Sequence, residues 1–214
     1  MSLTVPIASV SLNARDVVFA RSGETIFGPF SLALCGGDLC AIGGANGAGK
    51  TTLLQVFAGL LAPTTGTVEL ERDADGESGE TCGHVALLGH LNGLKLDLSA
   101  RSNLRFRESL TGADTSVTID AALARVGLAG YEMLALRELS AGQRRRVALA
   151  ALARSRAPLW LLDEPFANLD ADGRALVADL IAEQRTRGGI VVITTHGIDA
   201  LPADTQHFNV GAPQ

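Results

Sequence analysis

The residues best suited to chemistry form a glycine-rich loop that ends in a lysine and a threonine. Residues 44–51 read GANGAGKT and match the phosphate-loop pattern G-x-x-x-x-G-K-[ST] at every fixed position. The glycines let backbone N–H groups turn toward phosphate oxygens, Lys50 adds a positive charge, and Thr51 offers a hydroxyl to Mg²⁺. The predicted binding residues are Gly44, Ala45, Asn46, Gly47, Ala48, Gly49, Lys50, Thr51 and Thr52.

The segments on either side of this loop have the patterns that the motif requires. Residues 39–42, LCAI, are a short apolar run typical of a buried strand. Residues 52–61 carry apolar side chains at helical spacing and predict a helix whose positive end faces the phosphates. The order strand, loop, helix distinguishes the motif from a glycine-rich turn with a chance lysine.

Two acidic residues follow another apolar run, LWLL at 159–162. At the carboxyl end of a strand, Asp163 can reach the Mg²⁺ shell near Thr51, and Glu164 can orient or deprotonate the water that attacks the terminal phosphate. His196 follows the run IVVI at 190–193, which places it on the same edge of the sheet. Acids and histidines at strand ends are common, so this prediction depends on their combination with the phosphate loop.

A second candidate phosphate site lies in the segment LSAGQ, residues 139–143. Ser140 suits a helix N-cap, Gly142 permits close backbone approach, and the N–H groups at a helix start attract anions; Gln143 is predicted to bind nucleotide with them. Standing alone, the segment would suit an ordinary serine-capped helix. Because the chain has one phosphate loop, we expect the second site to bind the nucleotide of another subunit in a homodimer.

An α/β core must position these residues. Apolar runs predict further strands at 17–19, 30–34, 67–70 and 85–88. Helical spacing predicts helices at 99–110, 119–126, 141–154 and 175–184. This succession indicates an α/β fold with N-terminal antiparallel β strands and a helical subdomain at about 92–156. The chain shows no linker composition or long repeat, so we expect a single domain over residues 1–214.

The composition excludes several classes of protein. No apolar run reaches the roughly 18 residues that span a bilayer, and nothing at the N-terminus resembles a signal peptide, so we expect a cytoplasmic protein. The net charge of −5 argues against a nucleic-acid surface, and the arginines at 144–146 are expected to be solvated or to make structural contacts. Cys35, Cys40 and Cys82 fit neither a disulfide framework nor a zinc pattern and are expected to be buried thiols.

Taken together, GANGAGKT, LSAGQ, LLDEP and the histidine of TTH resemble the ATPase subunit of an ABC transporter, over about residues 11–200. The resemblance implies a P-loop NTPase core of the ABC ATPase type. It also implies a head-to-tail dimer with two ATP molecules between phosphate loop and signature. By the same resemblance Glu164 is the catalytic base, and Asp170 belongs to the loop that crosses the dimer interface.

Two positions depart from the family's pattern. An aromatic residue usually stacks on adenine just after the first strand, and alignment by spacing puts Arg21 there. A guanidinium can still stack on a purine, so we expect base binding at this position. The loop after the strand at 85–88 usually carries glutamine, and here that position is His90, which can hydrogen-bond a water or the metal shell.

These departures also narrow the resemblance. The segment 89–95, Leu98, Ser99 and the arginine-rich LSAGQRRRVALA are similar to the ATP-binding subunit of the cytochrome c maturation haem exporter. The resemblance implies membrane-spanning partner subunits, a peripheral position on the cytoplasmic face of the inner membrane, and no direct contact with haem. The alternatives are another ABC exporter, of drugs or lipoproteins, and a soluble ABC ATPase that acts on DNA or ribosomes.

Overall fold

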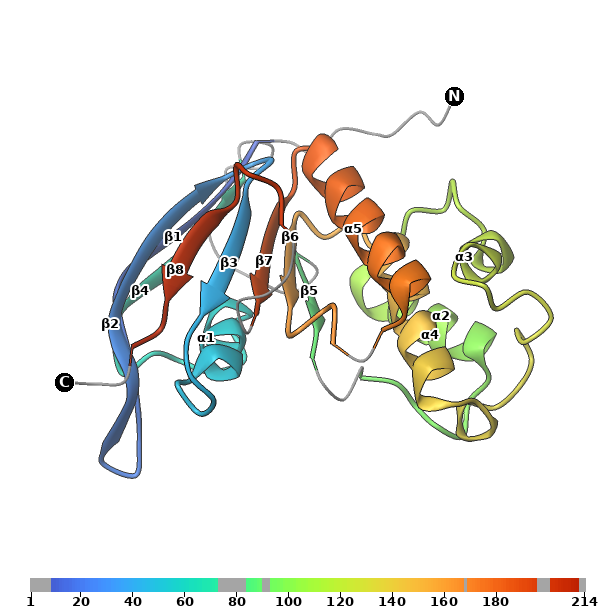
Figure 1. Ribbon diagram of the computed structural model, residues 1–214, viewed down its shortest axis with the longest axis horizontal. Coiled ribbons are helices and arrows are strands. Elements are labelled where there is room, and N and C mark those ends of the chain that lie inside the picture. Colours follow the sequence, from blue (N-terminus) through green and yellow to red (C-terminus); the bar gives the residue numbers. More distant parts are fainter. Residues whose placement is uncertain (1–8, 73–83, 90–92, 168, 196–200, 212–214) are drawn as a thin grey trace.

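The structure is a computed structural model, which describes residues 9–72, 84–89, 93–167, 169–195 and 201–211. Its strands are β1 (Val10–Arg21), β2 (Glu24–Cys35), β3 (Leu39–Gly43), β4 (Thr65–Arg72), β5 (Val85–Leu88), β6 (Leu159–Leu162), β7 (Ile190–Thr194) and β8 (Gln206–Asn209). Its helices are α1 (Lys50–Phe57), α2 (Ala100–Thr111), α3 (Ile119–Arg125), the short 3₁₀ helix η1 (Leu136–Glu138), α4 (Ala141–Ala153) and α5 (Ala171–Thr186). An antiparallel sheet, a parallel sheet and a group of helices lie next to one another (Figure 1).

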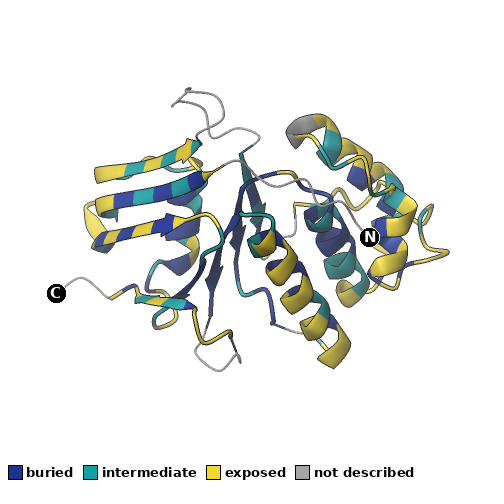
Figure 2. Ribbon diagram, turned by 90° about the horizontal axis from the view of Figure 1, so that it is seen from above, coloured by how far each residue is buried: buried dark blue, intermediate teal, exposed yellow. Residues whose placement is uncertain are grey.

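The antiparallel sheet has the strand order β2-β1-β4. The tight turn between β1 and β2 places Ser22 and Gly23 at positive φ, as a two-residue hairpin requires. Buried and exposed side chains alternate along β1 and β2, so one face of this sheet packs on the core (Figure 2). The predicted strands at 17–19, 30–34 and 67–70 are confirmed as parts of longer strands.

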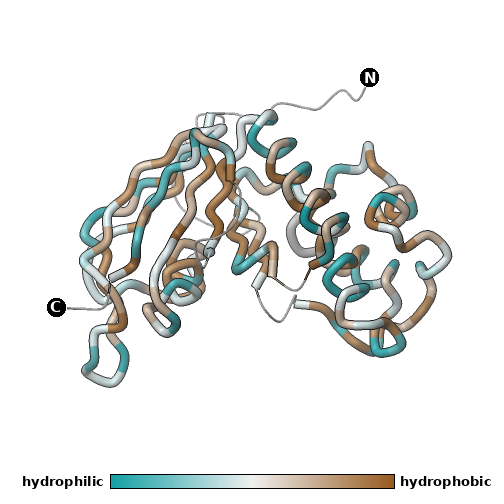
Figure 3. Tube along the Cα trace, viewed as in Figure 1, coloured by the Kyte–Doolittle hydropathy of each residue, from teal (hydrophilic) through white to brown (hydrophobic). Residues whose placement is uncertain are grey.

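The parallel sheet has the strand order β5-β6-β7-β3-β8 and carries the site. Strands β3, β6 and β7 are almost entirely apolar because both of their faces are covered, and β7 has a polar residue only at its end, Thr194. They appear as hydrophobic segments in the middle of the molecule (Figure 3). All of the pairings within this sheet are parallel, so the carboxyl ends of its strands share one edge. The loops that follow β3 and β6 therefore meet at that edge.

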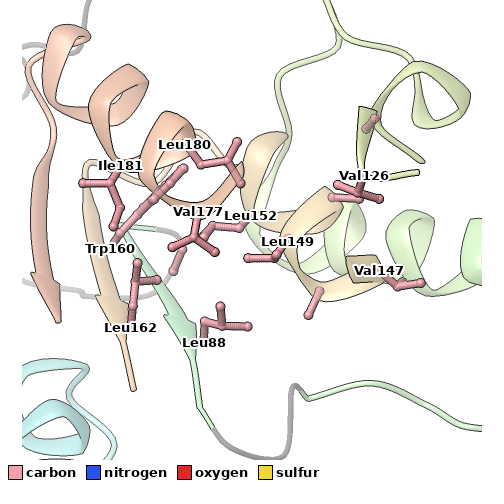
Figure 4. Packing of buried hydrophobic residues seen from close by; sticks show 14 of the residues in the cluster. Leu88, Val126, Val147, Leu149, Leu152, Trp160, Leu162, Val177, Leu180 and Ile181 are labelled. Carbon is pink, nitrogen blue, oxygen red and sulfur yellow. The ribbon is translucent and has the colours of Figure 1, made fainter. Parts of the chain in front are cut away.

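The parallel sheet separates two hydrophobic clusters. Leu159 and Leu161 of β6 face the cluster that contains α1 and the antiparallel sheet. Trp160 and Leu162 face the opposite cluster, which contains residues of α2, α3, α4 and α5 (Figure 4). The helices of residues 100–153 thus bury their apolar side chains in a cluster that continues onto the sheet.

The helices of the second cluster begin at side-chain caps. Ser99, Thr118, Ser140 and Asp170 cap α2, α3, α4 and α5, and each accepts a hydrogen bond from the backbone N–H three residues later. Each cap satisfies a backbone donor that the helix itself leaves unpaired. The predictions of α2, α3 and α4 from helical spacing are confirmed to within one residue at each end.

Several sequence-based predictions were wrong in their bounds. The helix predicted at 52–61 begins at Lys50 and ends at Phe57, because the chain turns at Gly59 with φ +70°. Helix α5 begins four residues before the predicted 175, and β8 was not predicted. Cys35 is exposed rather than buried, whereas Cys40 is buried; Cys82 lies outside the described residues. None of the described helices is long and apolar enough to cross a membrane.

Candidate functional site

The phosphate loop connects β3 to α1 and depends on glycine at two points of its backbone. Gly44 has φ +138°, and a Cβ atom there would lie 2.6 Å from the carbonyl oxygen of Val210. Gly49 has φ +92° and is the N-cap residue of α1. Residues 45–47 are exposed, so their backbone is accessible to a ligand at the N-terminus of α1.

Lys50 is held inside this loop. Its side chain is buried, with 7% of the residue's surface exposed. The ammonium group donates hydrogen bonds to the carbonyl oxygens of Gly44 and Ala45, with Nζ–O distances of 2.7 and 3.0 Å. The loop therefore surrounds a fixed positive charge, which suits the binding of a phosphate chain.

A chain of hydrogen bonds joins the phosphate loop to the ends of β6 and β7. The Thr51 hydroxyl donates to Asp163 Oδ2 at 2.8 Å, and the Thr194 hydroxyl donates to Asp163 Oδ1 at 2.6 Å. Asp163 is 3% exposed, and its carboxylate is oriented by these two threonines. A hydroxyl and a carboxylate beside a phosphate site form the hard oxygen donor set that Mg²⁺ prefers, so these residues fit that ion.

Glu164 lies next to Asp163 in an unusual backbone conformation. Its φ is +47°, in the left-handed region that residues other than glycine rarely adopt. Its backbone N–H donates to Thr194 Oγ1 at 2.9 Å. The turn after β6 thus directs Asp163 into the sheet edge and leaves Glu164 partly exposed, which fits the different roles predicted for the two acids.

The second predicted phosphate site lies at the exposed start of α4. Ser140 and Gln143 form a capping box, in which Gln143 N donates to Ser140 Oγ at 3.1 Å and Ser140 N donates to Gln143 Oε1 at 2.8 Å. A Cβ atom at Gly142 would meet only Ser140 Oγ, at 4.0 Å, so nothing in this chain's own packing requires glycine there. Helices α1 and α4 lie apart, on either side of β5 and β6 (Figure 1).

Two of the three arginines on α4 reach other elements. Arg145 donates to the carbonyl oxygens of Gly89 and Glu164, at 3.2 and 3.4 Å. Arg146 donates to the carbonyl of Val126 and pairs with Asp170, with Nη2–Oδ distances of 3.2 and 3.3 Å. The expectation that these arginines make structural contacts is confirmed for both residues.

Not all of the predicted site residues lie together. Arg21 is exposed at the end of β1, where it pairs in register with Glu24. His90 and His196 lie outside the described residues. The sequence analysis did not predict a role for Thr194. Its position could have indicated one, because Thr194 is a polar residue at the end of a buried strand and Asp163 follows another buried strand.

Comparison with known proteins gives one matching family model, described as ABC transporter, over residues 27–167. Curated relatives include the cytochrome c biogenesis ATP-binding export protein CcmA of Xanthomonas axonopodis pv. citri, which is 49% identical over 89% of each chain. The protein of the same name from Xylella fastidiosa strain Temecula1 is 40% identical over 91% of each chain.

Solved structures of ABC transporter proteins have a similar fold. A putative ABC transporter ATP-binding protein from Pyrococcus furiosus superposes with a TM-score of 0.77 and 26% identity, and the match covers 94% of this chain and 97% of that one. A bacterial Atm1-family ABC exporter with ATP bound has the same TM-score of 0.77 at 20% identity, and covers 99% of this chain and 38% of the exporter. The second likeness concerns the fold alone.

Proposed function

The chain belongs to the ABC transporter ATP-binding proteins and, among them, to the cytochrome c biogenesis ATP-binding export proteins, and we propose that it is the ATPase that drives haem delivery in cytochrome c maturation. The observation that carries the ATPase mechanism is the hydrogen bond between Thr51 Oγ1 and Asp163 Oδ2. It joins the phosphate loop to the acidic end of β6, and it unites two motifs that lie 112 residues apart.

The phosphate loop binds the phosphates of ATP in this mechanism. Its backbone N–H groups and the N-terminus of α1 face the phosphate oxygens, and the Lys50 ammonium exchanges its carbonyl partners for them. Thr51 and Asp163 would hold Mg²⁺, which would supply positive charge to neutralise the negative charge that develops during phosphoryl transfer.

Glu164 orients and deprotonates the attacking water. Its carboxylate follows the metal-binding Asp163 directly, and its backbone is fixed by Thr194. We add two histidines to this catalytic group, on the basis of the sequence motifs in which they stand. His196 is predicted to lie near the γ-phosphate, and His90 near the attacking water or the metal shell.

A second copy of the chain completes the nucleotide site. The open glycine of LSAGQ and the exposed cap Ser140 provide N–H and hydroxyl donors that this chain's own phosphate loop does not use. In a head-to-tail homodimer they would face the γ-phosphate of the partner's ATP, with Gln143 beside them. ATP binding would then close the dimer, and hydrolysis would let it open.

The motion of the dimer passes to membrane-spanning subunits. We place their docking groove near residues 90–107, which include the start of α2 and of which residues 90–92 lie outside the described residues. The chain would then lie on the cytoplasmic face of the inner membrane as a peripheral subunit. Haem itself need not contact this chain, because the chain supplies only the ATP-driven movement.

A genetic experiment tests the role in cytochrome c maturation. Deletion of the gene should leave c-type cytochromes without covalent haem while total haem synthesis continues. Complementation with the wild-type gene should restore them, and complementation with Lys50→Ala should not. Normal c-type cytochromes in the deletion strain would refute the role in haem delivery and leave the assignment as an ABC ATPase intact.

A further inference from the structure

Arg145 connects the helix that begins with LSAGQ to the turn that carries the proposed catalytic base. Its guanidinium donates from α4 to the carbonyl oxygen of Gly89, the first residue after β5, and to that of Glu164, the second residue after β6. These strands are neighbours in the parallel sheet. One side chain on a helix outside the sheet therefore holds two adjacent strand ends at the edge where the site lies.

The environment of Arg145 makes this contact costly to replace. The side chain is partly buried, and burial lowers the pKa of Arg145, while the nearby carboxylate of Asp163 raises it. A partly buried guanidinium with carbonyl partners is oriented by them, because donors left unpaired away from water cost free energy. Its planar fork can reach two acceptors at once, which a lysine ammonium does less specifically.

The carbonyl that Arg145 holds belongs to a residue whose backbone needs support. Glu164 has φ +47°, and its peptide groups are fixed on both sides: Thr194 accepts from its N–H, and Ala167 N donates to its carbonyl at 3.1 Å. Strained backbone persists where surrounding contacts over-determine it. Arg145 is the contact among these that comes from the helical subdomain.

We propose that Arg145 is a positioning residue, which sets the orientation of the Glu164 carboxylate according to the position of α4. This inference rests on the proposed function of Glu164 and of the homodimer. Ser140, at the start of α4, would contact the ATP that the partner subunit binds. Arg145, one turn further along the same helix, acts on the base that serves this subunit's own ATP. The side chain therefore links the two ATP sites of the dimer.

The test compares Arg145→Gln with a matched control, Arg125→Gln, in the full chain. Arg125 on α3 also joins the helical subdomain to the α/β core, through a two-point ion pair with Glu183 on α5, but it contacts neither strand end. Arg145→Gln should lower kcat by about 10- to 100-fold, as a small misplacement of a catalytic group does. It should leave the Kd for a fluorescent ATP analogue close to wild type, and kcat is measured well below the Tm of each variant, so that a lower Tm does not itself change kcat. Arg125→Gln should leave kcat unchanged.

Two further readouts separate positioning from general destabilisation. The Hill coefficient of ATP hydrolysis should fall toward unity in Arg145→Gln, because the link between the sites is removed. In the double variant with Glu164→Gln, the second substitution should cause no further loss of kcat, since Arg145 acts through Glu164. Additive losses, or a wild-type kcat in Arg145→Gln, would overturn the inference. A wild-type kcat in Glu164→Gln would instead refute the proposed base.

A conservative variant covers the case in which Arg145→Gln does not fold. Arg145→Lys keeps the positive charge near Asp163 but loses the planar fork, so kcat should still fall while the protein remains folded. An Arg145→Lys protein with wild-type kcat and an unchanged Hill coefficient would show that charge alone suffices, which contradicts positioning by the two carbonyl contacts.

Discussion

The phosphate loop and the first turn of α4 both combine glycine with free backbone N–H groups, but they differ in what surrounds them. The loop is completed within the chain: Lys50 is buried in it, and Thr51 is bonded to Asp163 of another strand. The start of α4 is exposed, and Ser140 and Gln143 bond only to each other among the contacts described above. The loop thus has its partners within the chain, whereas the start of α4 leaves its glycine and its cap exposed, which is why we propose that a second copy of the chain completes it.

The largest expected effect is at the phosphate-loop site. Glu164→Gln removes the proposed general base without changing the size of the side chain, so turnover should fall by about 10² to 10⁴. Binding of ATP should persist, because the phosphate loop is unchanged. Steady-state phosphate release and titration with a fluorescent nucleotide measure the two properties. Glu69→Gln, on the exposed face of β4, is the control and should match wild type.

Turnover of Glu164→Gln within a few-fold of wild type would exclude the role of base. In that case the end of β6 would serve only to hold the metal, and the phosphate loop together with β6 would not form a complete catalytic site within one chain.

A second experiment tests how much the buried middle of α4 contributes to the stability of the fold, in contrast to its exposed start. Leu149 is fully buried in the cluster that α4 shares with α5 and the sheet (Figure 4). Leu149→Ala should lower the free energy of unfolding by about 2 to 5 kcal/mol, through lost transfer energy and a cavity. Because that cluster continues onto β6, we expect one unfolding transition, measured by urea titration with circular dichroism and Trp160 fluorescence.

Two separate transitions with the two probes would mean that the helical subdomain unfolds independently. In that case the chain would not be the single domain that its sequence predicts.

The open site is tested by Ser140→Arg. A bulky cation at the start of α4 should lower hydrolysis by about 10- to 100-fold, since it would misplace the partner's ATP. It should not weaken nucleotide binding by the isolated monomer, whose own loop is intact. Thr118→Arg is the control, because Thr118 is also an exposed N-cap and its loss has a similar cost to the helix.

A mixture of Ser140→Arg and Lys50→Ala chains tests whether Ser140 acts on the ATP that the partner subunit binds. Each mixed dimer would keep at most one site with both an intact loop and an intact signature. If Ser140→Arg alone abolished ATP binding by monomers, the first turn of α4 would act within its own chain, and the dimer would lose its support.

The sequence predicted the phosphate-loop site better than it predicted the edge strand β8 or the contacts between α4 and the sheet. The bond between Thr51 and Asp163 follows from motifs that parallel strands bring to one edge. Strand β8 escaped prediction because Gln206–Asn209 is short and polar, and it is defined by its pairing with β3. The contacts of Arg145 could not be read from its spacing on a helix, since they depend on where α4 lies relative to β5 and β6.

The smallest expected effect is on binding of the adenine ring, for which Arg21 is the predicted contact. This residue ends β1 at an exposed turn, and we predict that its guanidinium lies against the adenine ring. A cation over an aromatic face contributes about 0.5 to 2 kcal/mol, so Arg21→Ala should raise the Kd for ATP by roughly two- to thirty-fold. Arg21→Tyr should restore or improve binding, because a ring can stack on the purine, while Arg15→Ala, also exposed on β1, should have no effect. Titration with a fluorescent nucleotide measures all four proteins. Equal affinities would mean that Arg21 is solvated and that the phosphates alone hold the nucleotide, in which case ATP, GTP and inorganic triphosphate should compete equally well for the site.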